Sequence, residues 1–520
     1  MATVVLGSAQ VPLTAVTAVE IAIIVLAAAP VLRVLGKPAV SRECRERPAV
    51  AAALLSGLLV VGFATSWAIT YSADTRLAIT CLAALFGPLS YLRSRTAYGA
   101  GRGLPPGSLG IGTSLDAITD PSFYLQEAQR HGWVFKMSQF GRPVVCIADL
   151  ATGFDFFAVN RESLAQANWA FNRLLPGGYV EFMEGDQHRH YRAILETAFG
   201  AAVDDSCQSD IRRSFATHLR RLAAANAGGP VALPQVIDRL AIASMLRMVV
   251  GLDSDDPRVD SFAEQFARLR DRPRQLLPVP RQLQATFDQT VESVLALGNA
   301  IATTGRLDSL HRSVLSEIAA RQPGYGADRA IAGNLTFMIN DGATMLRRLY
   351  GWIITFACDH PEALADIRAS VAAPVEPPSP PNDAALRFVA ETLRLRESEF
   401  IYRVTRRACH LNSYRVPAGW LVRLCVHEAH RRPAVFPDPE RFDPRRFIQS
   451  FAADDYSPFG RGAHGCFPAP MVVAIGAGFV QALAHYDWRT AVAAPPERIN
   501  RHWGFWQPGE AFRFSVVDRP

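Results

Sequence analysis

The stretch Ser457-Pro-Phe-Gly-Arg-Gly-Ala-His-Gly-Cys466-Phe-Pro468 organises the interpretation of this 520-residue chain. Its three glycines allow a tight loop whose backbone can approach a flat ligand closely. The next residues, 469–486, carry apolar side chains at helical spacing, so we expect Cys466 at a helix N-terminus. The helix dipole and the free N–H groups there favour the thiolate, which is the form of cysteine that binds metal. A single cysteine is more often a buried free thiol, so the metal-binding interpretation needs a second motif.

That second motif is Glu391-Thr-Leu-Arg394, where a carboxylate and a guanidinium fall one helical turn apart on the same face. Alone, this spacing is common on helix surfaces. It is followed by Arg446, within Phe442-Asp-Pro-Arg-Arg-Phe447, and then by the cysteine loop. In this order the motifs resemble those of the cytochrome P-450 family, and the resemblance covers about residues 104–520. In that family the three charged groups form a buried bidentate network that supports the haem loop.

The resemblance implies a mainly α-helical fold with small β-sheets, the cytochrome P-450 fold, including a β-hairpin around Gln139-Phe-Gly-Arg142. It implies haem b (iron protoporphyrin IX), with the Cys466 thiolate as axial ligand and Phe459 in the binding loop. His188 and Arg192 lie at i and i+4 of a predicted helix, a spacing equally typical of a solvated polar face. The family's donors to the haem propionates match four residues here: His188, Arg192, Arg403 and His464.

A long helix is expected over residues 328–358, and the matching helix of the family carries an acid followed by an alcohol for proton delivery to dioxygen. If Gly342 matches the glycine of that motif, Thr344 falls on the acid position and Met345 on the alcohol position. A shift of one residue places Thr344 on the alcohol position, but it loses the glycine and leaves Ala343 for the acid. Thr344 and Met345 are therefore predicted catalytic positions that depart from the family. An alternative role for Thr344 is a hydrogen bond back to its own helix.

Residues 1–98 are predicted to form a membrane module with about three transmembrane helices, at 11–35, 49–71 and 77–92. Basic residues gather between the first two segments and after the third, so the positive-inside rule places the catalytic domain on the cytoplasmic side. A cleaved signal peptide is the alternative, but a basic n-region is lacking and two further apolar segments follow. A Gly/Pro linker is expected at 99–112, followed by the haem-thiolate catalytic domain at 113–520.

Composition excludes several classes of function. The net charge is +6, but no Lys/Arg run alternates with aromatic residues, which argues against nucleic-acid binding. The eight cysteines are scattered without Cys-x-x-Cys pairs. This pattern argues against zinc, an iron–sulfur domain or a disulfide framework, and it fits a reducing compartment.

By resemblance, the protein is an oxidoreductase of specialised metabolism that inserts one oxygen atom from O2 into a small apolar substrate. We expect no flavin or ferredoxin module after the haem domain, so electrons should come from a separate ferredoxin with its reductase, or from a flavoprotein reductase. The incomplete acid–alcohol pair leaves two alternatives open. One is an enzyme of the same fold without standard O2 activation, such as a peroxygenase, isomerase, dehydratase or coupling enzyme. The other is a non-catalytic haem-binding membrane protein.

Overall fold

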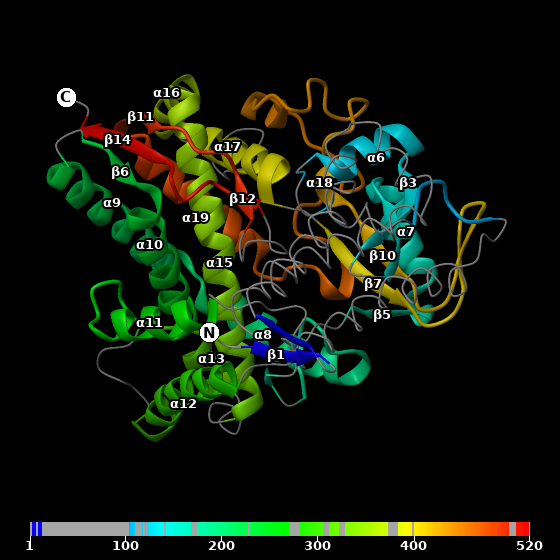
Figure 1. Ribbon diagram of the computed structural model, residues 1–520. Coiled ribbons are helices and arrows are strands. Elements are labelled where there is room, and N and C mark those ends of the chain that lie inside the picture. Colours follow the sequence, from blue (N-terminus) through cyan, green and yellow to red (C-terminus); the bar gives the residue numbers. More distant parts are fainter. Residues whose placement is uncertain are drawn as a thin grey trace. The chain divides into compact units, whose positions relative to one another are not determined.

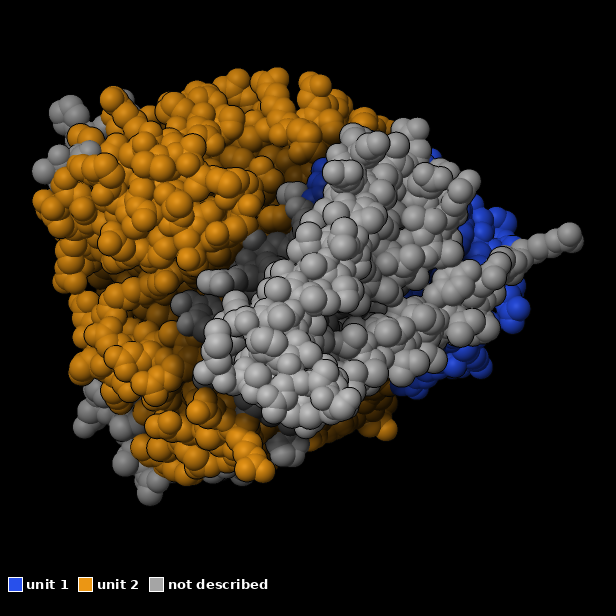
Figure 2. All heavy atoms as spheres, viewed as in Figure 1, with its two compact units in different colours: residues 1–148, 156–165, 403–424 blue, residues 149–155, 166–402, 425–520 orange. Residues whose placement is uncertain are grey.

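The chain forms two compact units, which Figure 2 shows in different colours. Unit 1 comprises residues 1–148, 156–165 and 403–424, and unit 2 comprises residues 149–155, 166–402 and 425–520. The structure, a computed structural model, describes residues 3–6, 9–12, 103–109, 117, 120, 122–139, 142–167, 174–175, 177–226, 229–270, 281–304, 311–321, 328–372, 383–397, 400–498 and 506–518.

Unit 1 is built on a five-stranded β-sheet with the strand order β3-β4-β10-β7-β5. The strands are β3 (Val134–Gln139), β4 (Arg142–Ile147), β10 (Leu421–Leu424), β7 (Ile401–Thr405) and β5 (Leu164–Gln166). The predicted hairpin is observed as β3 and β4, which pair antiparallel, and β10 joins β4 in parallel. Branched apolar residues dominate β4 and β10 because they pack well on a pleated, buried surface. Unit 1 also contains α6 (Phe123–His131), the end of α7 (Leu150–Val159), and the hairpins β8 (Cys409–Leu411) with β9 (Tyr414–Val416) and β1 (Thr3–Leu6) with β2 (Ala9–Pro12).

Part of the predicted linker, residues 103–107, is attached to unit 1. The Lys136 amide donates to the Pro106 carbonyl at 2.7 Å, and the Lys136 ammonium donates to the Pro105 carbonyl at 2.5 Å. The Gly103 carbonyl accepts the Arg415 amide, in β9, at 2.7 Å. An extended segment presents its carbonyls to strand edges, whose free N–H groups need partners. At these positions the Gly/Pro composition therefore marks a segment that runs along strands.

Unit 2 is mainly helical (Figure 1). The longest described helix, α15 (Arg329–Asp359), packs against α10, α12, α17 and α19. The other described helices are α8 (Gly185–Ala202), α9 (Asp205–Asn226), α10 (Leu233–Val249), α11 (Arg258–Arg270), α12 (Arg281–Thr304), α13 (Val314–Arg321), α16 (Pro361–Ala372), α17 (Ala384–Thr392), α18 (Val426–Ala429) and α19 (Ala469–Leu483). Two small sheets accompany them, β11 (Tyr486–Val492) with β14 (Arg513–Asp518) and β6 (Val231–Ala232), and β12 (Glu497–Arg498) with β13 (Trp506–Gln507).

Helix α15 begins at a side-chain cap and contains a close helix contact. The Asp328 carboxylate accepts the amides of Ala330 at 2.6 Å and Ile331 at 3.2 Å, which satisfies two of the free N–H groups of the first turn. In the middle of the helix, a Cβ at Gly342 would lie 2.6 Å from the terminal methyl group of Met245 in α10. Interiors are packed to crystal-like density, so a larger residue at this position would force the Met245 side chain to move.

The predicted fold is confirmed in outline, with many helices and small sheets. The helices expected at 328–358 and 469–486 are observed as α15 and α19. No helix in the described part of the chain is both long and apolar enough to cross a membrane. The predicted spans lie outside the described residues, except that Val11 and Pro12 belong to strand β2. The first predicted span therefore does not begin at Val11, because both residues pair in the hairpin with β1.

We expect that removing residues 1–102 leaves a folded protein, whereas removing residues 1–108 destabilises it. The shorter deletion keeps the Gly103 carbonyl and the two proline carbonyls on unit 1. The longer deletion removes three hydrogen bonds, each worth about 0.5–1.5 kcal/mol. The midpoint of thermal unfolding should then be lower by at least about 2 °C in the longer deletion. Equal midpoints would show that residues 103–108 contribute nothing to stability.

Candidate functional site

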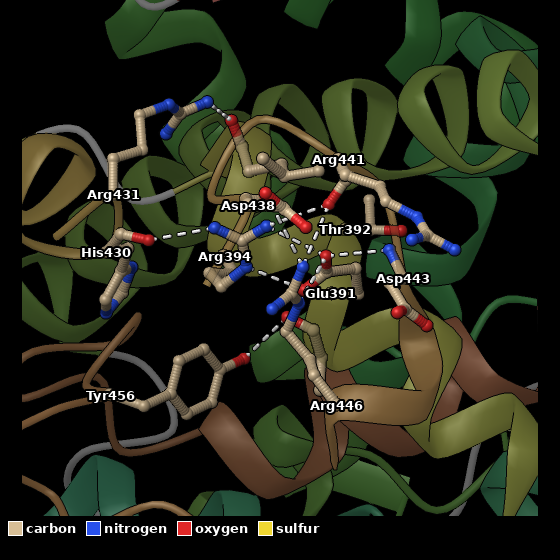
Figure 3. Close-up of polar contacts among 12 residues, drawn as sticks. Glu391, Thr392, Arg394, His430, Arg431, Asp438, Arg441, Asp443, Arg446 and Tyr456 are labelled. Atoms are coloured by element: carbon tan, nitrogen blue, oxygen red, sulfur yellow. Dashed lines mark hydrogen bonds and ion pairs between the residues drawn. The ribbon is translucent and has the colours of Figure 1, made fainter. Parts of the chain in front are cut away.

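Three charged residues form a buried ion network in unit 2 (Figure 3). Arg394 donates twice to the Glu391 carboxylate, from Nε to Oε2 at 2.7 Å and from Nη2 to Oε1 at 2.8 Å. Arg446 adds a hydrogen bond from Nε to Oε1 at 3.0 Å. The Glu391 and Arg394 side chains have 0% exposed surface, so each charge is tolerated only because the other compensates it. The structure thus brings together the three residues that the sequence predicts as a structural network.

The local backbone explains how Glu391 and Arg394 meet. Helix α17 ends at Thr392, and a π-helical turn over Leu393–Glu397 continues it. A residue pair three positions apart stays on one face of such a helix. The remaining Arg394 N–H groups donate to the carbonyls of His430 at 2.9 Å and Arg441 at 3.3 Å. The buried guanidinium therefore has acceptors on several sides, as a charge without solvent requires.

Two further contacts join this region to the start of the cysteine loop, and Figure 3 shows the one made by Tyr456. The Ser457 amide donates to Nε2 of His430 at 3.1 Å, and the Tyr456 hydroxyl donates to the Ala390 carbonyl at 2.9 Å. Burial, followed by two neighbouring guanidinium groups, lowers the pKa of His430 to about 3. The ring is therefore neutral near pH 7, and its Nε2 can accept a hydrogen bond. The ion network and this neutral histidine together fix the position where the loop begins.

The loop itself closes through its backbone. The Cys466 amide donates to the Phe459 carbonyl at 2.9 Å, and the Gly465 amide donates to the Gly462 carbonyl at 3.0 Å. Gly460 and Gly462 have φ values of 67° and 70°, which residues with a Cβ rarely adopt. The tight glycine loop followed by a helix is therefore observed as the sequence predicts.

The Cys466 thiol is both accessible and surrounded by protein. Its side chain is exposed, whereas the other described cysteines are buried or half-buried. Burial raises the pKa of the thiol to about 12, with smaller effects from the Glu181 and Asp341 carboxylates and an opposing effect from Arg192. The two properties are compatible, because a small molecule can reach a thiol that has protein on most sides. Cys466 lies two residues before Pro468, which is the N-cap of α19, so the cysteine precedes the helix N-terminus directly.

Three of the four predicted propionate partners lie beside the loop. The ring centroids of His188 and His464 are 4.1 Å apart, and His188 is buried. Arg192, one turn further along α8, donates to the Gly465 carbonyl at 2.9 Å. Arg403 belongs to unit 1, where its guanidinium lies 5.3 Å from the centroid of a phenylalanine ring. A propionate-binding role for Arg403 stays a prediction.

The groups around the loop suit a haem. An accessible cysteine in a glycine loop suits an axial iron ligand. Two imidazoles and a guanidinium at the same loop can donate hydrogen bonds to the two carboxylates of a haem. Phe459 and Phe467 pack half-buried against the core and add apolar surface, and the Arg192 guanidinium lies 5.3 Å from the Phe467 ring centroid. The residues present therefore fit an apolar, anionic, iron-containing ring.

Helix α15 carries Thr344 and Met345, the two positions that the sequence analysis compares with the family's acid–alcohol pair. The Thr344 side chain is buried, and its hydroxyl donates to the Asn340 carbonyl at 2.9 Å, as the alternative interpretation expects. The Met345 sulfur accepts a hydrogen bond from Arg348 at 3.5 Å. Sequence reasoning missed His430, which accepts the Ser457 amide at the start of the cysteine loop and an Arg394 N–H on its carbonyl.

We expect Arg446→Ala to destabilise the protein clearly more than Arg445→Ala. The Arg446 side chain is 9% exposed and bonds to buried Glu391, whereas its neighbour is 68% exposed and pairs with an exposed aspartate. Because Arg394 still neutralises Glu391, the loss should be about 2–3 kcal/mol, below the roughly 3–5 kcal/mol of a fully broken buried pair.

The Arg445 variant is the matched control, since an exposed ion pair is worth about 0–1 kcal/mol. Urea unfolding of both variants measures the difference. Similar losses in the two variants would contradict a structural role for the Arg446–Glu391 contact.

Comparisons with known proteins agree with this geometry. The family model described as Cytochrome P450 matches residues 382–515. The chain is 24% identical over 400 residues to abscisic acid 8'-hydroxylase 3 of Oryza sativa subsp. indica, with coverage of 70% of this chain and 77% of the relative. It is 25% identical over 446 residues to cytochrome P450 26C1 of Homo sapiens, with coverage of 72% and 80%. Among solved structures, retinoic acid bound cyanobacterial CYP120A1 has a TM-score of 0.67 at 20% identity, with coverage of 80% of this chain and 100% of that chain.

The solved structure shows that the chain has the cytochrome P450 fold. The family model and the relatives support the cytochrome P450 family. Because the relatives in this family are monooxygenases, the comparisons support an oxidoreductase of this type. They also imply haem with cysteine thiolate ligation as the cofactor.

Proposed function

We propose that this oxidoreductase is a haem-thiolate monooxygenase that inserts one oxygen atom from O2 into a small apolar substrate. The observation that carries the proposal is the setting of the Cys466 thiol. It is accessible, it lies in a closed glycine loop, and His464 and Arg192 contact the same loop. The Glu391–Arg394 pair supports the start of that loop through His430.

The side chains of the site would divide the work of holding the cofactor. Cys466 would give up its thiol proton and ligate the iron as thiolate, while its amide stays bonded to Phe459. When bound, thiolate-ligated haem supplies oxygen activation and favours O–O cleavage. Four residues would donate to the haem carboxylates through charge-assisted hydrogen bonds: His188, Arg192, His464 and Arg403.

Aromatic residues beside α15 support an apolar substrate. The Phe337 ring of α15 stacks on Tyr179 at 4.1 Å between centroids, and Phe182 meets it edge-on at 6.4 Å. The relatives' names point to substrates of similar character, since abscisic acid and retinoic acid are small and mostly apolar. Apolar walls with few polar groups are typical of small-molecule sites.

Electrons would come from a separate protein, either a ferredoxin with its reductase or a flavoprotein reductase. Residues 1–98 would anchor the enzyme in a membrane with the catalytic domain on the cytoplasmic side. The apolar segments and the distribution of arginine in the sequence support this topology.

A second candidate function follows from the Thr344 hydroxyl, which is committed to the Asn340 carbonyl. An enzyme of the same fold without standard O2 activation has no need of that hydroxyl. This candidate covers peroxide-using, isomerase, dehydratase and coupling enzymes. Turnover with reductase partners under O2, compared with turnover under peroxide, separates it from the monooxygenase. Haem loading without turnover in either assay would favour a non-catalytic haem protein.

The Cys466 assignment is tested by carbon monoxide. The reduced protein should give the shifted Soret band of thiolate-ligated haem, and Cys466→Ser should abolish that band because a hydroxyl replaces the thiolate. Cys358→Ser is the matched control, since Cys358 is half-buried in α15 and should leave the band unchanged. A shifted band that survives in Cys466→Ser would mean that another residue ligates the iron.

A further inference from the structure

His430 is bonded to two distant parts of unit 2 at once. Its carbonyl accepts an Arg394 N–H at 2.9 Å, on the side of the ion network (Figure 3). Its ring nitrogen Nε2 accepts the Ser457 amide at 3.1 Å, nine positions before Cys466 (466 − 457). The residue has 0% exposed surface. One buried side chain therefore contacts the start of the cysteine loop while its own backbone contacts the network that supports it.

The hydrogen-bond pattern determines which ring nitrogen of His430 carries the proton. A backbone N–H can only donate, so Nε2 presents its lone pair to Ser457, and the proton of the neutral ring lies on Nδ1. Nδ1 is buried and has no hydrogen-bond partner among the residues that the structure describes. The ring packs on Tyr456 at 5.1 Å between centroids and meets Phe436 edge-on at 6.1 Å. Aromatic packing and the Ser457 amide therefore hold the ring in place.

A second proton would leave the His430 ring without an acceptor on either side. Both nitrogens of an imidazolium are donors. The new Nε2–H would point at the Ser457 N–H, so two donors would face each other, and the Nδ1–H would still lack a partner in the described part of the chain. The contact with Ser457 cannot survive this change. Protonation of the ring and release of the amide are therefore coupled.

The groups around His430 also oppose protonation. Burial, followed by the charges of Arg394 and Arg431, lowers the pKa of the ring from 6.5 to about 3. Tyr456, a further titratable group against the ring, donates its hydroxyl proton to the Ala390 carbonyl. The carboxylates of the region act on arginines: Glu391 on Arg394 and Arg446, and Glu440 and Glu428 on Arg431.

We propose that His430 is a proton-sensitive positioning residue for the Cys466 loop, which holds the Ser457 amide while its ring is neutral and releases the loop when the ring takes a proton. In the released loop the ring reaches water and protonates in the ordinary range. Closure is therefore fully stabilised above about pH 6.5 and is weakened as the pH falls from there towards about 3. Within this window each pH unit raises the released fraction about tenfold. The proposal rests on the proposed function only in using haem ligation to report on the loop.

The first experiment titrates the shifted Soret band of the reduced, haem-loaded full chain with carbon monoxide bound. We expect the band to decrease as the pH falls from about 6.5 to about 4, and to return when the pH is raised. His430→Gln places an amide oxygen near the Nε2 position and does not titrate in this range. It should keep the band at pH 7, and the released-to-closed ratio should depend on about one proton fewer than in the unaltered protein. His430→Leu offers no acceptor, so its released fraction at pH 7 should be about tenfold higher.

His485→Gln is the matched control, because His485 is exposed just after the end of α19 in unit 2. It should titrate like the unaltered protein. An unchanged proton dependence in His430→Gln, or an equal loss of one proton in His485→Gln, would overturn the proposal. A ring that only fills space predicts the same band at pH 7 in the Gln and Leu variants, and that result would overturn it too.

Hydrogen exchange of the full chain as isolated tests the same contact without any variant and without the Soret band. Exchange of peptides that contain the Ser457 amide, corrected for the intrinsic rate, should speed up about tenfold per pH unit as the pH falls from about 6.5 to about 4. Peptides from the β3–β4 hairpin should keep constant protection. Constant protection at Ser457 would contradict the proposal, even if the His430 variants fail to load haem. If the unaltered protein shows no shifted band, the proposed haem-thiolate function fails, while exchange at Ser457 still decides the role of His430.

Discussion

The buried contact between Glu391, Arg394 and Arg446 is the interaction on which the rest of the candidate site depends. A carboxylate and a guanidinium with no exposed surface are each costly alone, because removing a charge from water costs several kcal/mol. The pairing is therefore compulsory once the chain is folded. It also fixes distant segments, since Glu391 and Arg446 are 55 positions apart.

Hydrogen bonds of neutral groups connect the ion network to the loop that contains Cys466. His430 gives its carbonyl to Arg394 and its ring nitrogen to the Ser457 amide. The ring can accept only because burial beside positive charge keeps it unprotonated. The loop that follows is then closed by backbone hydrogen bonds and by two glycines with positive φ. Electrostatics, together with apolar packing, thus determines where Cys466 lies.

In helix α15, the glycine and the threonine of the motif region have structural roles. Gly342 allows close contact with Met245 of α10, and the Thr344 hydroxyl bonds within its own helix. Both residues stand in the stretch that the sequence analysis compares with the family's motif, where Thr344 was a predicted catalytic position. The residues that hold the cysteine loop therefore follow the family's motifs, whereas Thr344 and Met345 of α15 depart from them.

The sequence by itself determined the features that depend on local spacing. These are the β3–β4 hairpin, the long α15 helix, the glycine loop before α19, and the pairing of Glu391 with Arg394. Periodicity and turn chemistry act over a few residues, so they can be read along the chain. Only the tertiary structure decided the attachment of residues 103–107 to strands, the contact of His430 with Ser457 and the raised thiol pKa of Cys466. Desolvation and charge contacts depend on which distant segments fold around a group, and local spacing does not contain that information.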